Sequence, residues 1–163
     1  MIIRAERAGD ERAVSVLITR TFAAADHASG EEAAIVERLR HEGDLEAAFV
    51  ATDGDEIVGH VAFSPVWIDG ARRGWFGLGP IAVAPERQRE GIGAALIGHG
   101  LANLRAQDAR GCVVLGDPGY YRRYGFERDA ALTYSDAPAE YFQRIIFQGE
   151  APRGVVSYSP AFG

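Results

Sequence analysis

Residues 79–96 read GPIAVAPERQREGIGAAL, and they join an apolar strand, a polar turn and the start of a helix. Ile81, Ala82 and Val83 are typical of a buried strand. Pro80 has no N–H to give to a sheet ladder, so we expect a bulge or a local split there. From Ile92 the apolar residues recur at helical spacing up to about Gln107, which predicts a helix.

The Gly91-x-Gly93 pattern lies where this helix starts. The first N–H groups of a helix have no internal partner and sit at the positive end of its dipole, so they favour an anion. Arg89 adds charge beside them. The pattern therefore predicts that residues 88–94 bind a phosphate-bearing ligand. A second interpretation is that the glycines only loosen the helix start.

Outside this stretch the pattern is that of an α/β (α+β) protein. The N-terminal half indicates a strand at 2–4, a helix at 10–24, a break at 26–30 and a second helix. An antiparallel hairpin of 47–51 and 57–63, turned at Asp53-Gly54, and a further strand at 75–83 follow. The C-terminal half indicates a strand at 111–116, a short helix from Pro118 that ends at Gly125, and strands near 144–147 and 154–158. We expect one domain, 1–163.

Composition restricts the function classes. The formal net charge is −6 and all 17 Lys-plus-Arg positions are arginine, so a P-loop or Schiff-base lysine is excluded. An acidic chain is a poor nucleic-acid binder and leans weakly towards cationic partners. No apolar run reaches about 20 residues, so we expect no membrane span. With no leader-like start and a single cysteine, Cys112, we expect a cytoplasmic protein. The histidines have no metal-ligand spacing, so we expect no metal.

Two motifs resemble those of the GNAT superfamily of N-acetyltransferases. Gln88-x-x-Gly91-x-Gly93 resembles the loop that binds the pyrophosphate of acetyl-coenzyme A, and the strand of residues 81–83 matches the strand that pairs with its pantetheine arm. Downstream, Tyr120-Tyr-Arg-Arg-Tyr-Gly-Phe126 resembles a second family motif. The resemblance extends to about residue 126 and most closely fits a bacterial subgroup of predicted acetyltransferases. Gly116-Asp-Pro-Gly119 replaces the Asn-containing stretch of many members.

The resemblance implies a fold, a cofactor and an activity. It implies a mixed, mostly antiparallel sheet, split between two parallel strands and flanked by about four helices. It implies transfer of an acetyl group from acetyl-coenzyme A to a primary amine of a small molecule or peptide, in a ternary complex. The implied cofactor-binding residues are Ile81, Ala82, Val83, Gln88, Arg89, Glu90, Gly91, Ile92, Gly93 and Ala94.

The resemblance aligns Tyr121 with the tyrosine that protonates the coenzyme A thiolate in many relatives. A phenol can donate to a thiolate of comparable basicity. We expect Tyr120 and Tyr124 to pack in the core, and a backbone N–H near Ile81 to polarise the thioester carbonyl. No general base is assigned; the candidates are Glu86, Asp117, His60, Glu31 and Glu32.

Other hypotheses stay open at this point. One is a coenzyme A-binding module without turnover. Another is a dinucleotide-dependent oxidoreductase with Asp117 as the ribose-binding acid, although its fingerprint needs a glycine where Leu96 stands. In the family the first two helices and the C-terminal strands shape the acceptor side, here about 10–41 and 127–163, and neither segment identifies the amine. The apolar run 155–158 fits either an interior strand or an edge shared in a homodimer.

Overall fold

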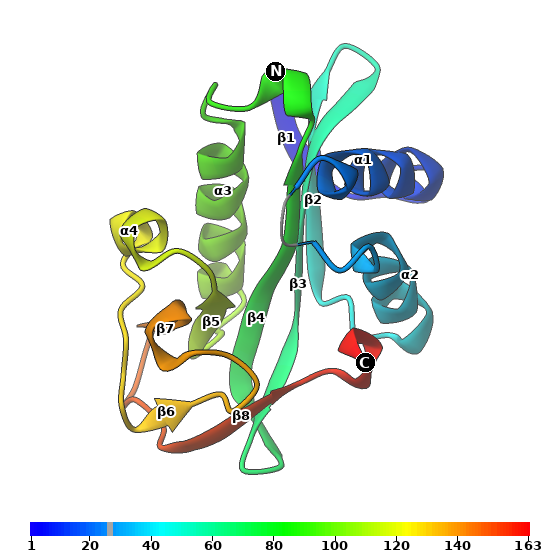
Figure 1. Ribbon diagram of the computed structural model, residues 1–163. Helices are drawn as coiled ribbons and strands as arrows, with labels where there is room; N and C mark the ends of the chain where they lie inside the picture. The colour runs from blue at the N-terminus through cyan, green and yellow to red at the C-terminus, as the bar shows by residue number, and fades with distance from the viewer. Residues whose placement is uncertain (26–27) are drawn as a thin grey trace.

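The computed structural model describes residues 1–25 and 28–163 (Figure 1). Two residues of the break expected at 26–30 lie outside the described part of the chain. The helices are α1 (Glu11–Ala23), α2 (Glu32–Glu42), α3 (Ile92–Ala106) and α4 (Pro118–Tyr121). The strands are β1 (Ile2–Ala5), β2 (Ala47–Asp53), β3 (Glu56–Ile68), β4 (Ala71–Val83), β5 (Gly111–Leu115), β6 (Leu132–Thr133), β7 (Phe142–Ile146) and β8 (Gly154–Tyr158).

The strands form one mixed sheet in the order β1-β2-β3-β4-β5-β7, with β8 added to β3 and β6 added to β8. All neighbours are antiparallel except β4–β5 and β6–β8. The expected mostly antiparallel mixed sheet is therefore confirmed. It differs from the doubly wound parallel sheet of dinucleotide-binding folds, so the oxidoreductase hypothesis does not fit.

The sheet is split between β4 and β5, as expected. The two parallel strands pair only over Trp75–Gly77 and Gly111–Val113, after which β4 continues to Val83 beside β3 alone. The split begins next to a bulge in β4. Val61 pairs with Ile81 and Phe63 pairs with Leu78, so Gly79 and Pro80 together face a single residue of β3. The interruption expected at Pro80 is thus confirmed.

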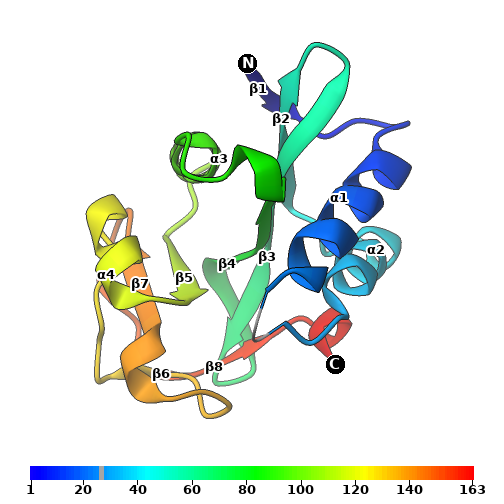
Figure 2. The same cartoon turned by 45° about the horizontal axis from the view of Figure 1, so that its top comes forward.

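Helices cover both faces of the sheet (Figure 2). α3 packs against β2, β3 and β4 on one face, while α1 packs on β3 and β4 from the other face and against α2. The largest core cluster includes Leu17 and Ile18 of α1, Phe63 of β3 and Leu96 of α3, all at most 4% exposed. This burial is the main driving force that holds helices to sheet.

The hairpin of β3 and β4 is longer than the sequence predicts. We expected strands at 57–63 and 75–83, but β3 runs on to Ile68 and the chain turns at Asp69-Gly70. Ser64 and Pro65 hide the continuation, because neither is a typical strand residue. A second buried cluster stabilises the extension, and it contains Val66, Ile68, Trp75 and Val156.

The C-terminal strands were predicted with less accuracy than the rest. The expected strand at 144–147 is β7 (Phe142–Ile146), two residues earlier at its start. The apolar run 155–158 belongs to β8 and lies inside the sheet, between β3 and β6. The short helix does begin at Pro118, and Gly125 ends the following turn with φ 101°.

Of the helices described, none is long and apolar enough to cross a membrane. Within 1–25 and 28–163, no group of three or more His, Cys, Asp or Glu side chains is placed to hold a metal ion. Cys112 is fully buried in β5, and burial raises the pKa of its thiol, as expected of a packing residue.

Candidate functional site

The largest of the cavities beside the split, about 580 Å³, lies between the β4–α3 loop and α4, and we call it the loop cavity. Its lining residues are Thr21, Ile81, Val83, Arg87, Gln88, Arg89, Gly91, Ile92, Gly93, Ala94, Tyr120, Tyr121 and Arg123. The cavity thus unites both sequence motifs, which lie far apart along the chain.

The start of α3 directs unpaired backbone amides into this region. The first intrahelical bond runs from the Ala95 N–H to the Gly91 carbonyl oxygen (3.0 Å), so the three preceding N–H groups have no helical partner. Arg89 (φ 66°) and Gly91 (φ 86°) are both left-handed, and this conformation turns the chain from the end of β4 into the helix. At Gly91 only glycine adopts it without cost. The geometry suits a bound anion.

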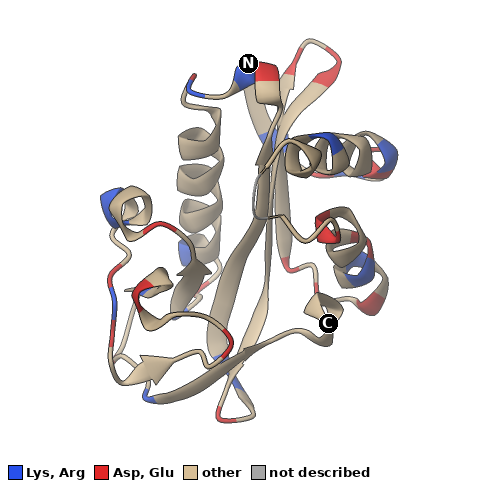
Figure 3. Ribbon diagram, viewed as in Figure 1, with Lys and Arg blue, Asp and Glu red and all other residues tan. Residues whose placement is uncertain are grey.

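Arginines add positive charge to the loop cavity. Arg87 is already compensated, because it donates to Asp53 (2.8 Å) and to Glu90 (3.0 Å). In the described chain no carboxylate pairs with Arg89 or Arg123, and the Arg123 guanidinium lies 4.7 Å from the centre of the Tyr120 ring. Figure 3 shows basic segments before α3 and on α4, beside strands that carry little charge. The cavity therefore favours phosphate oxygens.

Most of the predicted cofactor-binding residues line the loop cavity, and two do not. Ala82 is 2% exposed and its side chain packs into the core, so only its backbone could take part. Glu90 turns to Arg87 instead of the cavity. Gln88 lines the cavity while its amide donates to the Val83 carbonyl oxygen (3.2 Å), which ties the loop to the strand.

Four lining residues were missed from the sequence as binding residues: Thr21, Arg87, Tyr120 and Arg123. Tyr120 and Tyr124 do pack against the core, as expected, but Tyr120 also borders the cavity. Its hydroxyl accepts a hydrogen bond from Tyr124 (2.8 Å) and lies 3.4 Å from where a Cβ on Gly93 would stand. The i, i+3 spacing of Tyr120 and Arg123 was the signal for them, whereas nothing local marked Thr21.

A second cavity, about 360 Å³, lies on the α1 and α2 side of the split, and we call it the aromatic cavity. Its lining residues are Phe22, Glu32, Ile35, Leu78, Gly79, Pro80, Ile81, Leu115, Tyr121, Tyr134, Tyr158 and Phe162. Five of these are aromatic. The two cavities share Ile81 and Tyr121, so molecules bound in both would meet at the break in β4.

Tyr121 is the side chain at this junction. It is 9% exposed, and burial raises the pKa of its phenol to about 12. It packs edge-on against Tyr120 and Phe126, with ring centroids 5.0 and 5.9 Å apart. The phenol therefore stays protonated across the neutral range, which makes it a hydrogen-bond and proton donor and not a base.

Asp117 has a structural role that fixes where Tyr121 lies. It is the N-cap of α4, and its Oδ1 accepts from the Gly119 N–H (2.9 Å). Its carbonyl oxygen accepts from the N–H groups of Tyr120 (3.1 Å) and Tyr121 (3.0 Å). Asp117 therefore acts as a helix cap, which orients the short helix.

Among the candidate bases, Glu86 is paired with Arg20, with an Nη2–Oε1 distance of 2.6 Å, and this bond lowers the pKa of Glu86. Glu31 lines neither cavity. Glu32 borders the aromatic cavity, where its carboxylate accepts from Ser29 and Gly30 N–H groups at 3.1 Å each. Although burial alone would raise the pKa of Glu32, its hydrogen bonds lower it, so the group stays ionised.

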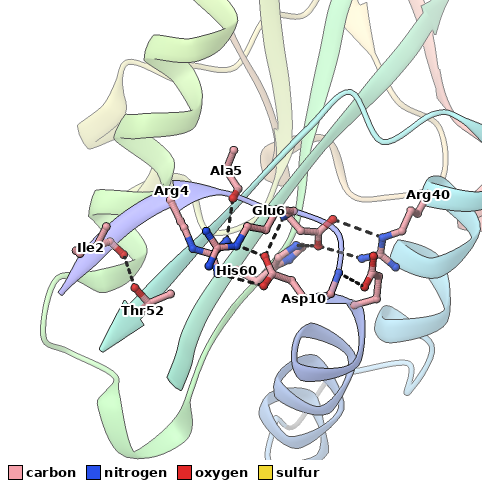
Figure 4. Close-up of polar contacts among 11 residues, drawn as sticks. Ile2, Arg4, Ala5, Glu6, Asp10, Arg40, Thr52 and His60 are labelled. Atoms are coloured by element: carbon pink, nitrogen blue, oxygen red, sulfur yellow. Dashed lines mark hydrogen bonds and ion pairs between the residues drawn. The ribbon is translucent and has the colours of Figure 1, made fainter. Parts of the chain in front are cut away.

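His60 belongs to a separate buried network (Figure 4). Its Nε2 lies 3.0 Å from Glu6 Oε1, and the Arg40 guanidinium donates to the same oxygen (2.9 Å). His60 is fully buried and lines neither cavity. The contacts join β3, the segment after β1 and α2. This histidine therefore anchors α2 to the sheet instead of acting at the junction.

Comparison with known proteins gives consistent matches. The family model described as an acetyltransferase (GNAT) domain matches residues 44–128. The Escherichia coli K12 protein YhbS, named as an uncharacterised N-acetyltransferase, is 38% identical over 78% of this chain and 74% of its own length. A Brucella melitensis GNAT acetyltransferase, solved with acetyl-coenzyme A, is 43% identical with a TM-score of 0.90, covering 99% of this chain and 97% of that one.

A second solved structure is that of YhbS from Escherichia coli in complex with coenzyme A. It is 32% identical to this chain, with a TM-score of 0.91, and the match covers 99% of this chain and 91% of that one. The likeness thus spans both cavities as well as the motif region.

Proposed function

Because the chain belongs to the GNAT acetyltransferase family, we propose that it transfers an acetyl group from acetyl-coenzyme A to a primary amine by direct attack in a ternary complex. The observation that carries this proposal is the junction at Ile81 and Tyr121, where the loop cavity and the aromatic cavity meet. Two reactants held at one junction gain several kcal/mol of barrier lowering from alignment alone.

The residues present fit acetyl-coenzyme A. The amides at the start of α3, with Arg89 and Arg123, would hold its phosphates, and the open edge of β4 along 81–83 would pair with its extended arm. A Cβ at Gly93 would narrow this cradle towards Tyr120. When bound, the cofactor supplies an acetyl group activated as a thioester.

The chain then contributes orientation and a proton. We infer that a backbone N–H near the bulge at Ile81 donates to the acetyl oxygen as negative charge develops there. The nitrogen–carbon bond forms as the carbon–sulfur bond breaks, and the amine loses one proton to water. Tyr121 gives its phenolic proton to the departing sulfur and regains one from solvent. At a pKa near 12 it protonates the sulfur only once charge has developed on it.

The test is thermal unfolding with acetyl-coenzyme A, with NAD as the control ligand. At a concentration about 100 times its Kd, acetyl-coenzyme A should raise the midpoint by about 5–10 °C, and NAD should not. Thiol release with a panel of amines follows. No stabilisation would refute the cofactor site. Stabilisation without turnover of any amine would favour the alternative of a coenzyme A-binding module. That alternative is worth testing because two of the candidate bases, Glu86 and Asp117, are engaged in other contacts.

A further inference from the structure

The residues that line the aromatic cavity restrict which acceptor can bind there. Aromatic rings from five separate segments converge there: Phe22 of α1, Tyr121 of α4, Tyr134 after β6, Tyr158 of β8 and Phe162 beyond it. Tyr158 packs edge-on against Tyr134 (5.1 Å between centroids), and its ring centroid lies 5.3 Å from that of Phe162. Edge-to-face arrays of this kind provide flat apolar surface for another ring.

The backbone makes room for this wall. A Cβ on Gly77 would lie 2.7 Å from Tyr158 Cε1, which is too close for a real contact. The missing side chain lets the Tyr158 ring lie directly against β4, next to the point where β4 and β5 separate. The aromatic surface therefore reaches the inner end of the split. At about 360 Å³ the space is at the small end of ligand sites.

The cavity has one charge at its border. Within the described residues, Glu32 is the single charged side chain that lines it. The carboxylate is fixed, because the Ser29 hydroxyl (2.9 Å) and two backbone N–H groups donate to it. One cationic nitrogen can be compensated by Glu32 and by ring faces, which attract cations. Among the described lining residues, a second or third ammonium group would find no further carboxylate to compensate the water that it loses.

We propose that the aromatic cavity selects a primary amine carried on a compact aromatic or apolar body, with arylalkylamines as the fitting class, over polyamines and peptide amino termini. This inference rests on the proposed function. The ring of the acceptor packs among Tyr134, Tyr158 and Phe162, and its amino group reaches the junction at Tyr121 and Ile81. Glu32 draws in the ammonium form, which gives one proton to water, and the resulting neutral amine attacks.

The experiment compares 2-phenylethylamine, spermidine and a short unblocked peptide as acceptors at saturating acetyl-coenzyme A. We expect kcat/KM for 2-phenylethylamine to be at least tenfold above that of the other two. Tyr158→Leu and Tyr134→Leu should each raise its KM about tenfold and leave acetyl-coenzyme A binding unchanged. Tyr141→Leu, at a 45% exposed tyrosine that lines neither cavity, is the matched control. Midpoints of unfolding identify any variant that does not fold.

Preference for spermidine or the peptide would overturn the inference and leave the acetyltransferase proposal standing. A tyrosine variant that slows the acetylation of all three acceptors equally would also overturn the inference. If no amine is acetylated, calorimetry of 2-phenylethylamine on the coenzyme A-saturated protein decides. Binding at least tenfold tighter than spermidine, weakened by Tyr158→Leu, supports the cavity's selectivity while the transfer proposal fails. Equal or undetectable binding overturns the selectivity as well.

Discussion

The loop cavity and the aromatic cavity lie on the two sides of one break in β4, but they are made of different parts. The loop cavity is largely one continuous segment, residues 81–94, and its main groups are backbone amides and arginines. The aromatic cavity is assembled from side chains of α1, α2, β4, β8 and the loops around them. The first depends on backbone conformation and the second on side-chain identity. Substitutions should therefore affect cofactor and acceptor separately.

Tyr121 lines both cavities, and its substitution should have the largest effect on the rate. Tyr121→Phe should lower kcat about 100-fold, because the sulfur loses its proton donor, with the Kd of acetyl-coenzyme A unchanged. The matched control is Tyr141→Phe. Because burial raises the pKa of Tyr121 to about 12, kcat of the native protein should not decline through loss of this proton between pH 7 and 10. Full turnover by Tyr121→Phe would remove the acid role.

The Glu6–His60–Arg40 network lies outside both cavities, but it anchors α2, which contributes to one wall of the aromatic cavity. Glu6→Ala should lower the free energy of unfolding by about 1–3 kcal/mol, because His60 and Arg40 lose their partner. Chemical denaturation measures this, with the exposed Glu42→Ala as control. Acetyl-coenzyme A affinity should be unaffected.

The same anchor has a pH dependence with a definite sign. Burial by itself would raise the pKa of Glu6, but the hydrogen bonds from His60 and Arg40 lower it below its ordinary value of 4.5. A lowered folded pKa stabilises the protein above 4.5, and this contribution is lost as pH falls through the folded pKa. The stability gap between native protein and Glu6→Ala should therefore be complete at pH 7 and narrow only as the pH falls below 4.5. A constant gap would contradict this assignment.

Substitution of Gly93 tests whether the loop cavity binds its ligand through the backbone. Gly93→Leu should weaken acetyl-coenzyme A binding at least tenfold, since its side chain would occupy the space before Tyr120 and Val83. Gly98→Leu is the control on the same helix, because nothing lies within 4 Å of a Cβ there. Calorimetry compares the two. Equal affinities would show that the phosphates bind elsewhere.

Substitutions of Asp117 should have the smallest effect on the rate, and they distinguish a helix cap from a general base. Asp117→Ala should lower stability by about 1 kcal/mol and reduce kcat, because α4 and Tyr121 lose their orientation. Asp117→Asn keeps a side-chain oxygen for the Gly119 N–H, so its rate should stay within about twofold of native. A base would behave in the opposite way, with Asp117→Asn as inactive as Asp117→Ala.

The same contrast explains what the sequence could predict. The strand, turn and glycines of the loop cavity are local in sequence, so their pattern predicted most of the residues that line this cavity. Tyr158 and Tyr134 carried no local signal, because their role depends on β8 pairing with β3 and β6 across long stretches of chain. Glu90 lies within the predicted stretch, but its side chain pairs with Arg87 and does not line the loop cavity.

The break between β4 and β5 leaves an unpaired strand edge inside the molecule. Open edges ordinarily invite pairing with other chains and promote aggregation, and proteins protect them with charges or cover. Here the protection is geometric. A foreign strand needs about 4.8 Å on each side of its backbone, whereas this gap tapers to the direct β4–β5 pair at Gly77 and Val113. We therefore expect this edge to accept a thin, flexible chain more readily than a strand of another protein.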